Sequence, residues 1–290
     1  MQSIIIATAA VAIIGLLIGV LLVIVGNKFK VETDPREAAV REFLPGNNCG
    51  GCGYAGCDAL AAAIVAGDAP VNGCPVGGDA VGEQIANIMG VEAEEGVKKV
   101  AFVKCAGDCD HAVVKCNYVG IKDCTSAAAS GLSPWKCDYG CLGFGSCAVA
   151  CPFDAIHVVN GVARVDRAKC KACGKCTAAC PKHLIELLPV TAVHAVECSN
   201  KDRGPAVKKV CSAGCLGCKL CEKQCETGAI TVEKNVAHID YEKCTGCGKC
   251  AEACPFGLIV KTEGNPASKC IACGICAKAC PMDVLEVVEE

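Results

Sequence analysis

The sequence predicts a chain of the α+β class, in which one N-terminal membrane helix precedes a series of small cysteine-rich domains. Three observations support this expectation. An apolar run stands near the start of the chain, 30 of the 290 residues are cysteine, and aromatic residues make up only 4% of the chain. So few aromatic side chains do not suit one large apolar core. Most of the fold is therefore expected to depend on cross-links or on bound metal.

The first expected element is a transmembrane helix from Ile4 to Gly26, a run without a charged residue. A helix of this length reaches roughly 35 Å, which exceeds the hydrocarbon core of a bilayer, about 30 Å. A cleaved signal peptide is the alternative, but the positive residues that normally precede such a segment are missing. Lys28 and Lys30 follow the run. The positive-inside rule then predicts a single-pass protein of the cytoplasmic membrane with most of its chain in the cytoplasm.

The cysteines are expected to be metal ligands, because a reducing cytoplasm does not maintain a disulfide framework. The dominant pattern is C-x2-C-x2-C-x3-C-P, which binds a [4Fe–4S] cluster in bacterial ferredoxins. Three runs have this pattern: Cys170, Cys173, Cys176 and Cys180; Cys244, Cys247, Cys250 and Cys254; and Cys270, Cys273, Cys276 and Cys280. A fourth run lacks only the proline: Cys215, Cys218, Cys221 and Cys225. Zinc sites usually pair two C-x2-C units instead, which disfavours a zinc-binding or metal-storage protein.

An internal repeat organises the middle of the chain, since residues 151–180 match residues 225–254 at an offset of 74. Each copy contains a predicted hairpin. The first joins Ile156–Val159 to Val162–Val165, and the second joins Ile230–Glu233 to Val236–Ile239. Each copy is therefore expected to be a ferredoxin module with two clusters, in which the fourth cysteine of each run ligates the other cluster.

This reciprocal arrangement predicts one ligand set for each cluster. In the second module the sets are Cys215, Cys218, Cys221 with Cys254, and Cys244, Cys247, Cys250 with Cys225. The leading run of the first module lacks its middle cysteine, and we expect Cys137, which aligns with Cys211, to replace it. The first-module sets are then Cys137, Cys141, Cys147 with Cys180, and Cys170, Cys173, Cys176 with Cys151. The last run has no partner run; we expect it to use Cys280 or to exchange ligands with the Cys244 run.

A different four-cysteine site precedes the repeat. Cys49, Cys52 and Cys57 are followed by Cys74, with a short helix expected at Asp58 to Ala66. A zinc site is the alternative here, since four cysteines do not distinguish the metals. Four further residues, Cys105, Cys109, Cys116 and Cys124, follow no named pattern and are either a seventh cluster site or free thiols. Cys198 and Cys211 are unassigned, although Val196-Glu-Cys198 echoes Val103-Lys-Cys105.

The expected domain order follows from these sites. It is an anchor (1–26), an N-terminal [4Fe–4S] domain (27–85), a cysteine-containing linker region (86–130), a first two-cluster ferredoxin module (131–190), and a second ferredoxin module with an extra cluster run (191–290). About six [4Fe–4S] clusters are expected, and seven or more if the unassigned cysteines bind one. No catalytic residue and no Gly-rich dinucleotide fingerprint is evident, so neither flavin nor nucleotide is expected on this chain.

The segment from Gly46 to Cys57 reads G-N-N-C-G-x-C-G-x-x-G-C. Together with the membrane run before it and the tandem ferredoxin modules after it, this segment resembles the B subunits of the Rnf complexes, in their longer clostridial-type form. The resemblance covers essentially the whole chain. It implies an electron-transport subunit of a membrane translocase that passes electrons from reduced ferredoxin toward NAD and couples this to Na+ or H+ transport.

The resemblance also implies partners: soluble ferredoxin as electron donor and other membrane subunits of the complex, but no nucleic acid. This chain would carry electrons only. Because about twenty residues separate the membrane run from Cys49, we expect electrons to enter at the distal modules and to leave through the Cys49–Cys74 site. The alternative is a polyferredoxin subunit of another membrane oxidoreductase, such as a hydrogenase or a formate-oxidising complex.

Overall fold

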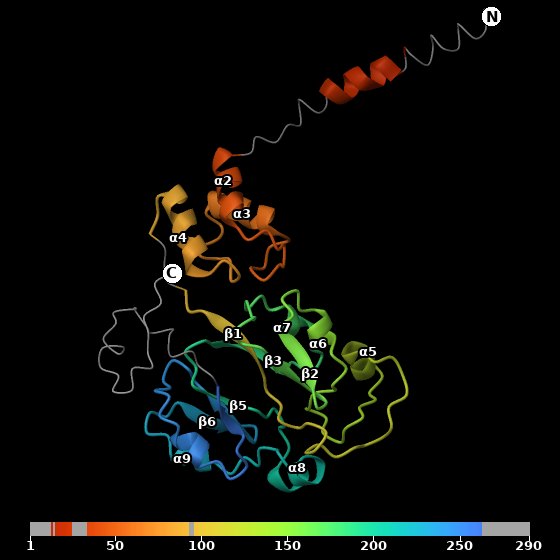
Figure 1. Cartoon of the computed structure of the whole chain (residues 1–290), viewed down its shortest axis with the longest axis vertical. Coiled ribbons are helices and arrows are strands. Elements are labelled where there is room, and N and C mark those ends of the chain that lie inside the picture. Colours follow the sequence, from red (N-terminus) through yellow and green to blue (C-terminus); the bar gives the residue numbers. More distant parts are fainter. Residues whose placement is uncertain (1–12, 14, 25–33, 93–95, 263–290) are drawn as a thin grey trace, which may run out of the picture.

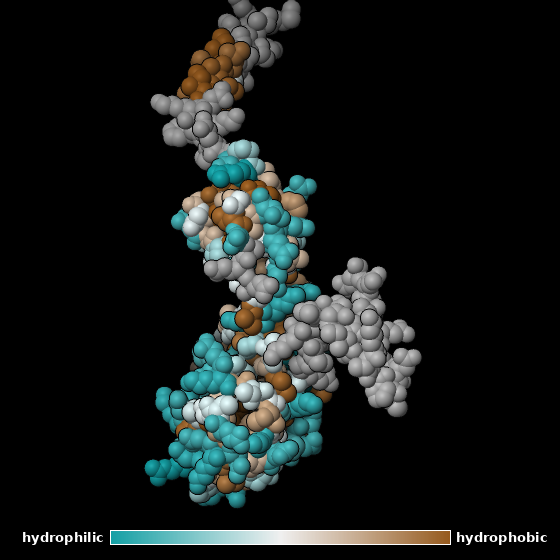
Figure 2. Space-filling view, turned by 90° about the vertical axis from the view of Figure 1, so that its left-hand side faces the viewer, coloured by the Kyte–Doolittle hydropathy of each residue, from teal (hydrophilic) through white to brown (hydrophobic). Residues whose placement is uncertain are grey.

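The computed structural model describes residues 13, 15–24, 34–92 and 96–262, and every structural statement below concerns these residues. They form a helical N-terminal unit and two strand-containing modules that follow it (Figure 1). The expected anchor, Ile4 to Gly26, lies partly outside the described residues. Its described part is helical and exposes its large apolar side chains, which form the brown helix of Figure 2. Over the described ranges, no helix has both the length and the apolar character needed to span a bilayer.

The N-terminal unit consists of three helices, α2 (Pro35–Phe43), α3 (Cys57–Ala66) and α4 (Gly78–Met89). Helix α2 begins at Asp34, whose carboxylate accepts a hydrogen bond from the Arg36 backbone N–H at 2.8 Å. Helix α3 confirms the short helix that the sequence predicts between the third and fourth cysteines. The core of this unit is small and contains five large aliphatic side chains: Val40, Leu44, Leu60, Ile64 and Ile85.

The first module contains two antiparallel strand pairs. Strands β2 (Ile156–Val159) and β3 (Val162–Val165) form the predicted hairpin, with Ile156 opposite Val165. Its turn residues, Asn160 and Gly161, both have positive φ, as the two-residue turn of a hairpin requires. Strand β1 (Lys99–Val103) pairs with β4 (Ile185–Pro189). Three short helices complete the module: α5 (Cys124–Ala129), α6 (Ser146–Val149) and α7 (Lys175–Ala179).

The second module repeats this plan. Strands β6 (Ile230–Glu233) and β7 (Val236–Ile239) form the second predicted hairpin, and β5 (His194–Val196) pairs with β8 (Ile259–Lys261). Its helices are α8 (Gly204–Val210), α9 (Leu220–Lys223) and α10 (Lys249–Glu252). The core of each module combines a few aliphatic residues with cysteines. Many of the thiols therefore lie in the module interiors.

The two modules correspond beyond the repeat that is visible in the sequence. Val103 lies opposite Ile185 in the first module, and Val196 lies opposite Ile259 in the second. The echo between Val103-Lys-Cys105 and Val196-Glu-Cys198 thus marks equivalent strands. The region 86–130, expected to be a linker, therefore supplies the outer strand of the first module. This region forms a strand because the edge of β4 offers backbone N–H and C=O groups with which β1 pairs.

Candidate cluster sites

The structure describes 26 of the cysteines, and all are free thiols. No three His, Cys, Asp or Glu side chains of the described ranges are grouped tightly enough to hold one metal ion. The cysteines nevertheless gather in groups of four, each around a shared hollow or with mutually interacting thiols. The run from Cys270 to Cys280 lies outside the described residues.

The N-terminal group contains Cys49, Cys52, Cys57 and Cys74, as the sequence predicts. Cys57 and Cys74 are buried in the core of the helical unit, and Cys52 packs against the same core. Burial, followed by the nearby thiols of Cys57 and Cys49, raises the pKa of Cys74. The side-chain oxygen of Asn48 accepts the Cys57 backbone N–H at 2.8 Å. This hydrogen bond fixes the ligand loop on the first turn of α3.

The first module contains the predicted group of Cys151, Cys170, Cys173 and Cys176. Burial, followed by the other three thiols, raises the pKa of Cys176 to about 11. The backbone N–H of Ala101 donates to Sγ of Cys170 at 3.4 Å, and the N–H of Ala155 donates to Sγ of Cys151 at 3.4 Å. Hydrogen bonds of this kind are a main means by which proteins tune iron–sulfur clusters.

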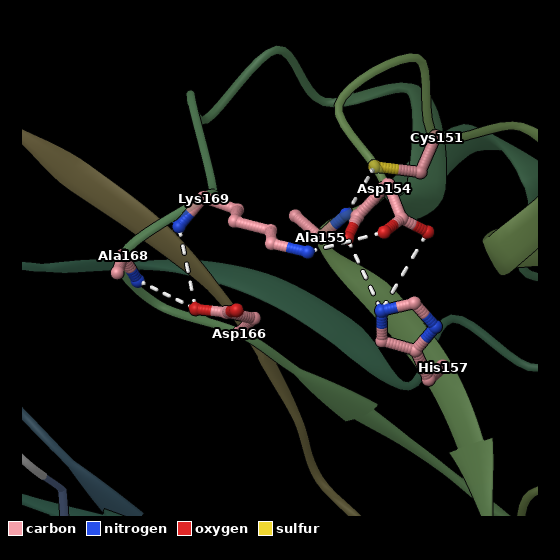
Figure 3. Close-up of polar contacts among 7 residues, drawn as sticks. All are labelled: Cys151, Asp154, Ala155, His157, Asp166, Ala168 and Lys169. Atoms are coloured by element: carbon pink, nitrogen blue, oxygen red, sulfur yellow. Dashed lines mark hydrogen bonds and ion pairs between the residues drawn. The ribbon is translucent and has the colours of Figure 1, made fainter.

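A polar frame holds the two halves of this group together (Figure 3). Asp154 lies in the turn after Cys151, and Lys169 directly precedes Cys170. The Lys169 ammonium and the Asp154 carboxylate form an ion pair at 3.1 Å. Asp166 accepts hydrogen bonds from the backbone N–H groups of Ala168 and Lys169 at 3.0 and 3.3 Å. The ring of His157 contacts Asp154, at 3.6 Å from its carboxylate, and thus belongs to this frame. The frame connects the turn after one ligand to the loop that precedes the next.

The other group of the first module differs from the expectation. Cys141, Cys147 and Cys180 line a hollow of about 400 Å³, but the fourth cysteine there is Cys124. Burial, followed by the thiols of Cys141, Cys124 and Cys180, raises the pKa of Cys147 to about 12. Cys137, which the sequence alignment places in this set, instead lines a neighbouring hollow, which Cys141 also lines. The structure thus places Cys124, and not Cys137, in the hollow with these three thiols.

The physical reason is a contact between the starts of two helices. Asp123 accepts the Ser126 N–H at 2.8 Å and thereby caps α5. The Ser146 hydroxyl, at the start of α6, donates to Asp123 at 2.6 Å and accepts the Cys124 N–H at 2.8 Å. Because Cys147 follows Ser146, this contact brings Cys124 to the group. The sequence signal that would have indicated it is an Asp-Cys pair before the alanine-rich segment.

The second module groups its thiols as the reciprocal arrangement predicts. One hollow, of about 380 Å³, is lined by Cys215, Cys218, Cys221 and Cys254. The other, of about 350 Å³, is lined by Cys225, Cys244, Cys247 and Cys250. Burial, followed by its three partner thiols, raises the pKa of Cys221 to about 11. Cys218 and Cys247 are exposed, so this module brings two thiols of its groups to the surface.

Six described cysteines of the prediction remain. Cys105, Cys137, Cys198 and Cys211 line a hollow at the junction of the two modules. Cys109 and Cys116 are exposed and line none of these hollows. The four cysteines from Cys105 to Cys124, considered in the sequence as one set, are thus divided among three places.

The N-terminal group and the first module meet at a close contact. A side-chain carbon at Gly51, between Cys49 and Cys52, would lie 2.6 Å from the carbonyl oxygen of Cys173. Burial and then the thiol of Cys49 raise the pKa of Cys173. The loop of one cysteine group therefore lies directly on the loop of the next.

The chemistry of these groups suits [4Fe–4S] clusters. Three of them line one hollow each with four thiols, and several sulfurs accept backbone N–H groups. The thiols with a clearly raised pKa, such as Cys147, Cys176 and Cys221, are neutral without metal at neutral pH, whereas a thiol that coordinates iron is deprotonated. A cluster bound in such a group supplies one-electron redox chemistry, and this chain's residues hold it and set its surroundings.

Comparisons with known proteins agree with this geometry. Residues 44–76 match a family model for an Fe-S cluster, residues 162–185 match a 4Fe-4S binding domain, and residues 214–258 and 243–285 match 4Fe-4S dicluster domains.

Three relatives match most of the chain, and each is the B subunit of a complex named for ion translocation. That of the Na(+)-translocating ferredoxin:NAD(+) oxidoreductase complex of Acetobacterium woodii is 44% identical over 89% of this chain and 78% of the relative. That of the ion-translocating oxidoreductase complex of Methanosarcina acetivorans is 45% identical over 88% and 97%. That of the proton-translocating ferredoxin:NAD(+) oxidoreductase complex of Clostridium ljungdahlii is 43% identical over 89% and 93%.

Proposed function

The chain belongs to the family of B subunits of ion-translocating ferredoxin:NAD oxidoreductase complexes, the Rnf complexes, and we propose that it is the electron-transfer subunit of such a complex. It carries electrons that come from reduced ferredoxin and move toward NAD, while the complex as a whole couples this transfer to the movement of Na+ or H+. The observation that carries this proposal is the contact between Gly51 and Cys173, which places the N-terminal cysteine group next to a cysteine group of the first ferredoxin module. Contiguous groups of this kind suit a chain of one-electron carriers.

We base the direction of electron transfer on which cysteines are exposed and on which group lies nearest in sequence to the apolar run. In the second module Cys218 and Cys247 are exposed, so a soluble ferredoxin can approach the clusters that we assign there. In the first module Cys173 and Cys176 are buried, and the N-terminal loop lies against Cys173. The N-terminal group is also the one nearest in sequence to the apolar run. We therefore place ferredoxin at the second module and the onward membrane partner at the N-terminal group.

We further propose that residues 4–26 anchor the chain in the cytoplasmic membrane and that the modules lie on the cytoplasmic side. The exposed apolar side chains of the described part of this run support the proposal (Figure 2), as do the lysines that follow it. Protease treatment of inside-out vesicles should then degrade the modules, whereas intact cells with the outer envelope opened should protect them. Degradation from outside the cell would contradict this orientation.

The proposed function is tested with two cysteine variants in the whole complex. Cys52→Ala should leave the ferredoxin-module clusters reducible by ferredoxin while stopping electron transfer to NAD. Cys247→Ala should impair the first reduction itself. The matched control is Cys116→Ala, because this exposed cysteine belongs to none of the groups. A Cys52→Ala complex that reduced NAD from ferredoxin at the normal rate would refute the proposed order.

A further inference from the structure

Four cysteines outside the groups described above, together with Cys141 of the Cys124 group, line a hollow at the junction of the two modules. Cys105 follows β1, Cys137 follows Trp135, Cys198 follows β5, and Cys211 ends α8. Cys105, Cys198 and Cys211 are 7%, 9% and 7% exposed, and Cys137 is half-buried. Their hollow measures about 400 Å³, the same as the hollow of the Cys124 group. The space at the junction is therefore as large as the space that Cys124, Cys141, Cys147 and Cys180 line.

The two modules supply equivalent pairs to this hollow. Cys105 lies two residues beyond strand β1 of the first module, and Cys198 lies two residues beyond the equivalent strand, β5, of the second. Cys137 aligns with Cys211 in the repeat. The hydrogen bonds repeat as well. The backbone N–H of Cys141 donates to Sγ of Cys105 at 3.4 Å, and the N–H of Cys215 donates to Sγ of Cys198 at 3.3 Å. The site thus has an approximate twofold arrangement, with two thiols from each side.

Each sulfur also receives a backbone N–H from the residue two positions further along the chain. The donors are Gly107 to Cys105, Asn200 to Cys198, Tyr139 to Cys137 and Ala213 to Cys211. The side-chain amide of Asn200, which is 2% exposed, donates to Sγ of Cys137 at 3.5 Å. Four thiols that all accept N–H groups resemble the ligands of a cluster, whose sulfurs are stabilised in this way.

An unpartnered donor lines the same hollow. Trp135 contributes to its wall, and the buried Nε1–H of this indole has no hydrogen-bond partner within the described ranges. Indole nitrogen is a donor only, and a buried donor without an acceptor costs free energy. A cluster in the hollow would bring sulfide, which accepts hydrogen bonds. This observation is independent of the cysteines and supports the presence of an acceptor beside Trp135.

The peptide around the hollow holds the two modules together. The Ala106 N–H donates to the Glu197 carbonyl at 2.9 Å, and the Ser199 hydroxyl donates to the Lys104 carbonyl at 3.2 Å. Residues 111–113 pair with the end of α8, since the Val113 N–H donates to the Val210 carbonyl at 3.0 Å. The four cysteines are thus positioned by backbone contacts between the modules.

We propose that Cys105, Cys137, Cys198 and Cys211 ligate a [4Fe–4S] cluster that joins the two ferredoxin modules, in addition to the clusters within them. This cluster crosslinks the modules through iron. It also accepts one electron from a cluster of the second module and passes one electron to a cluster of the first, so it returns to its starting oxidation state and no covalent bond changes. The relay role rests on the proposed function, whereas the ligation does not.

The test is an iron and sulfide count on the full chain. Cys105→Ala and Cys198→Ala, one from each module, should each lower the content by about four iron and four sulfide per chain. The double variant should lose no more than either single variant, because both cysteines serve one cluster. Electron paramagnetic resonance should show the loss of one cluster and no change in the others. Cys116→Ala should keep the full content.

Three results would overturn the proposal: unchanged iron in the single variants, a loss of about eight iron in the double variant, or zinc in place of iron at this site. If an alanine variant loses all of its iron because the chain does not fold, Cys198→Ser decides the matter. A serine oxygen keeps a ligand in place, so one cluster should persist with a shifted potential and spectrum. Potentials and spectra identical to those of the unchanged protein would exclude the site. None of these readouts depends on ferredoxin or NAD.

Discussion

Gly51 lies so close to Cys173 that a side-chain carbon on the glycine would be 2.6 Å from the cysteine carbonyl oxygen and 2.8 Å from its Cα. Real side-chain carbons do not approach backbone this closely, so only glycine allows the N-terminal loop to lie on the first module. This contact joins the Cys49–Cys74 group to the Cys151 group. The proposed electron path therefore requires glycine at position 51, because any larger side chain would push the two loops apart.

Replacing Gly51 by alanine should separate the N-terminal unit from the first module without removing a cluster. Electron transfer from ferredoxin to NAD by the whole complex should slow by on the order of tenfold or more, since small displacements between reacting groups are costly. Iron content should stay the same. Gly96→Ala is the control, because a side chain there meets atoms only at 3.6 Å and beyond. Equal rates for the two variants would contradict the role of the contact.

Replacing Cys124 by alanine should remove one cluster from the first module. The structure places this thiol with Cys141, Cys147 and Cys180, so its loss leaves three ligands and about four fewer iron atoms per chain are expected. Cys116→Ala, eight residues earlier, should lose none. If Cys124→Ala kept its iron and the spectrum of every cluster, the fourth ligand of this site would have to be sought elsewhere.

The sequence predicted most of the fold but only part of the sites, and the difference has a physical cause. The hairpins and the reciprocal groups depend on local spacing within a repeat, so periodicity and turn residues are sufficient to predict them. The place of Cys124 depends on the contact of Asp123 with Ser146, which lies in a segment without counterpart in the second module. The junction group combines residues from two modules, and no local pattern shows that Cys105 lies beside Cys211.

The ion pair between Arg164 and Glu197 should stabilise the junction of the modules. Its atoms are 2.6 Å apart, and the Glu197 side chain is only 15% exposed. Arg164→Ala leaves this carboxylate poorly solvated and without its partner, which should lower the free energy of unfolding by about 1–2 kcal/mol. The effect is not larger because the Arg164 side chain is 40% exposed, and water weakens such a pair.

Lys169→Ala breaks the ion pair between Lys169 and Asp154. The Lys169 side chain is 50% exposed and the Asp154 side chain is 73% exposed. Exposed pairs contribute little, so this variant should leave the stability nearly unchanged. Urea unfolding of the iron-loaded chain, followed by circular dichroism, compares the two variants. The junction role would be wrong if both variants had the same midpoint as the unchanged protein.

Iron loss should accelerate as the pH falls. Burial and neighbouring thiols raise the pKa of Cys147 to about 12 and that of Cys176 to about 11, so in the absence of iron these thiols hold their protons throughout the neutral range. Binding iron therefore releases protons, and a higher proton concentration must favour the iron-free form. With a constant excess of chelator, loss of visible absorbance should be faster at pH 6 than at pH 8. A rate independent of pH would show that thiol protonation does not limit the release.

Removing iron should unfold both ferredoxin modules, because their cores contain few large apolar side chains. The largest fully buried ones are Val100, Val162 and Leu184 in the first module, and Val207 and Ile230 in the second. The rest of each core mixes smaller numbers of valine and isoleucine with cysteine and alanine around hollows, and such spaces lose packing contacts when they are empty. Each fully buried aliphatic side chain contributes about 1.5–3 kcal/mol, which is small beside the chain entropy of a module. Cluster ligation must supply the difference, as metal does in other small domains.

The N-terminal unit, which buries Val40, Leu60, Ile64 and Ile85, should keep more of its structure than the modules when iron is removed. Limited proteolysis of the iron-free chain should therefore digest residues 99–262 before residues 34–92, and far-ultraviolet circular dichroism should retain helix while losing strand. An iron-free chain with modules as protease-resistant as those of the loaded chain would show that the peptide alone holds this fold.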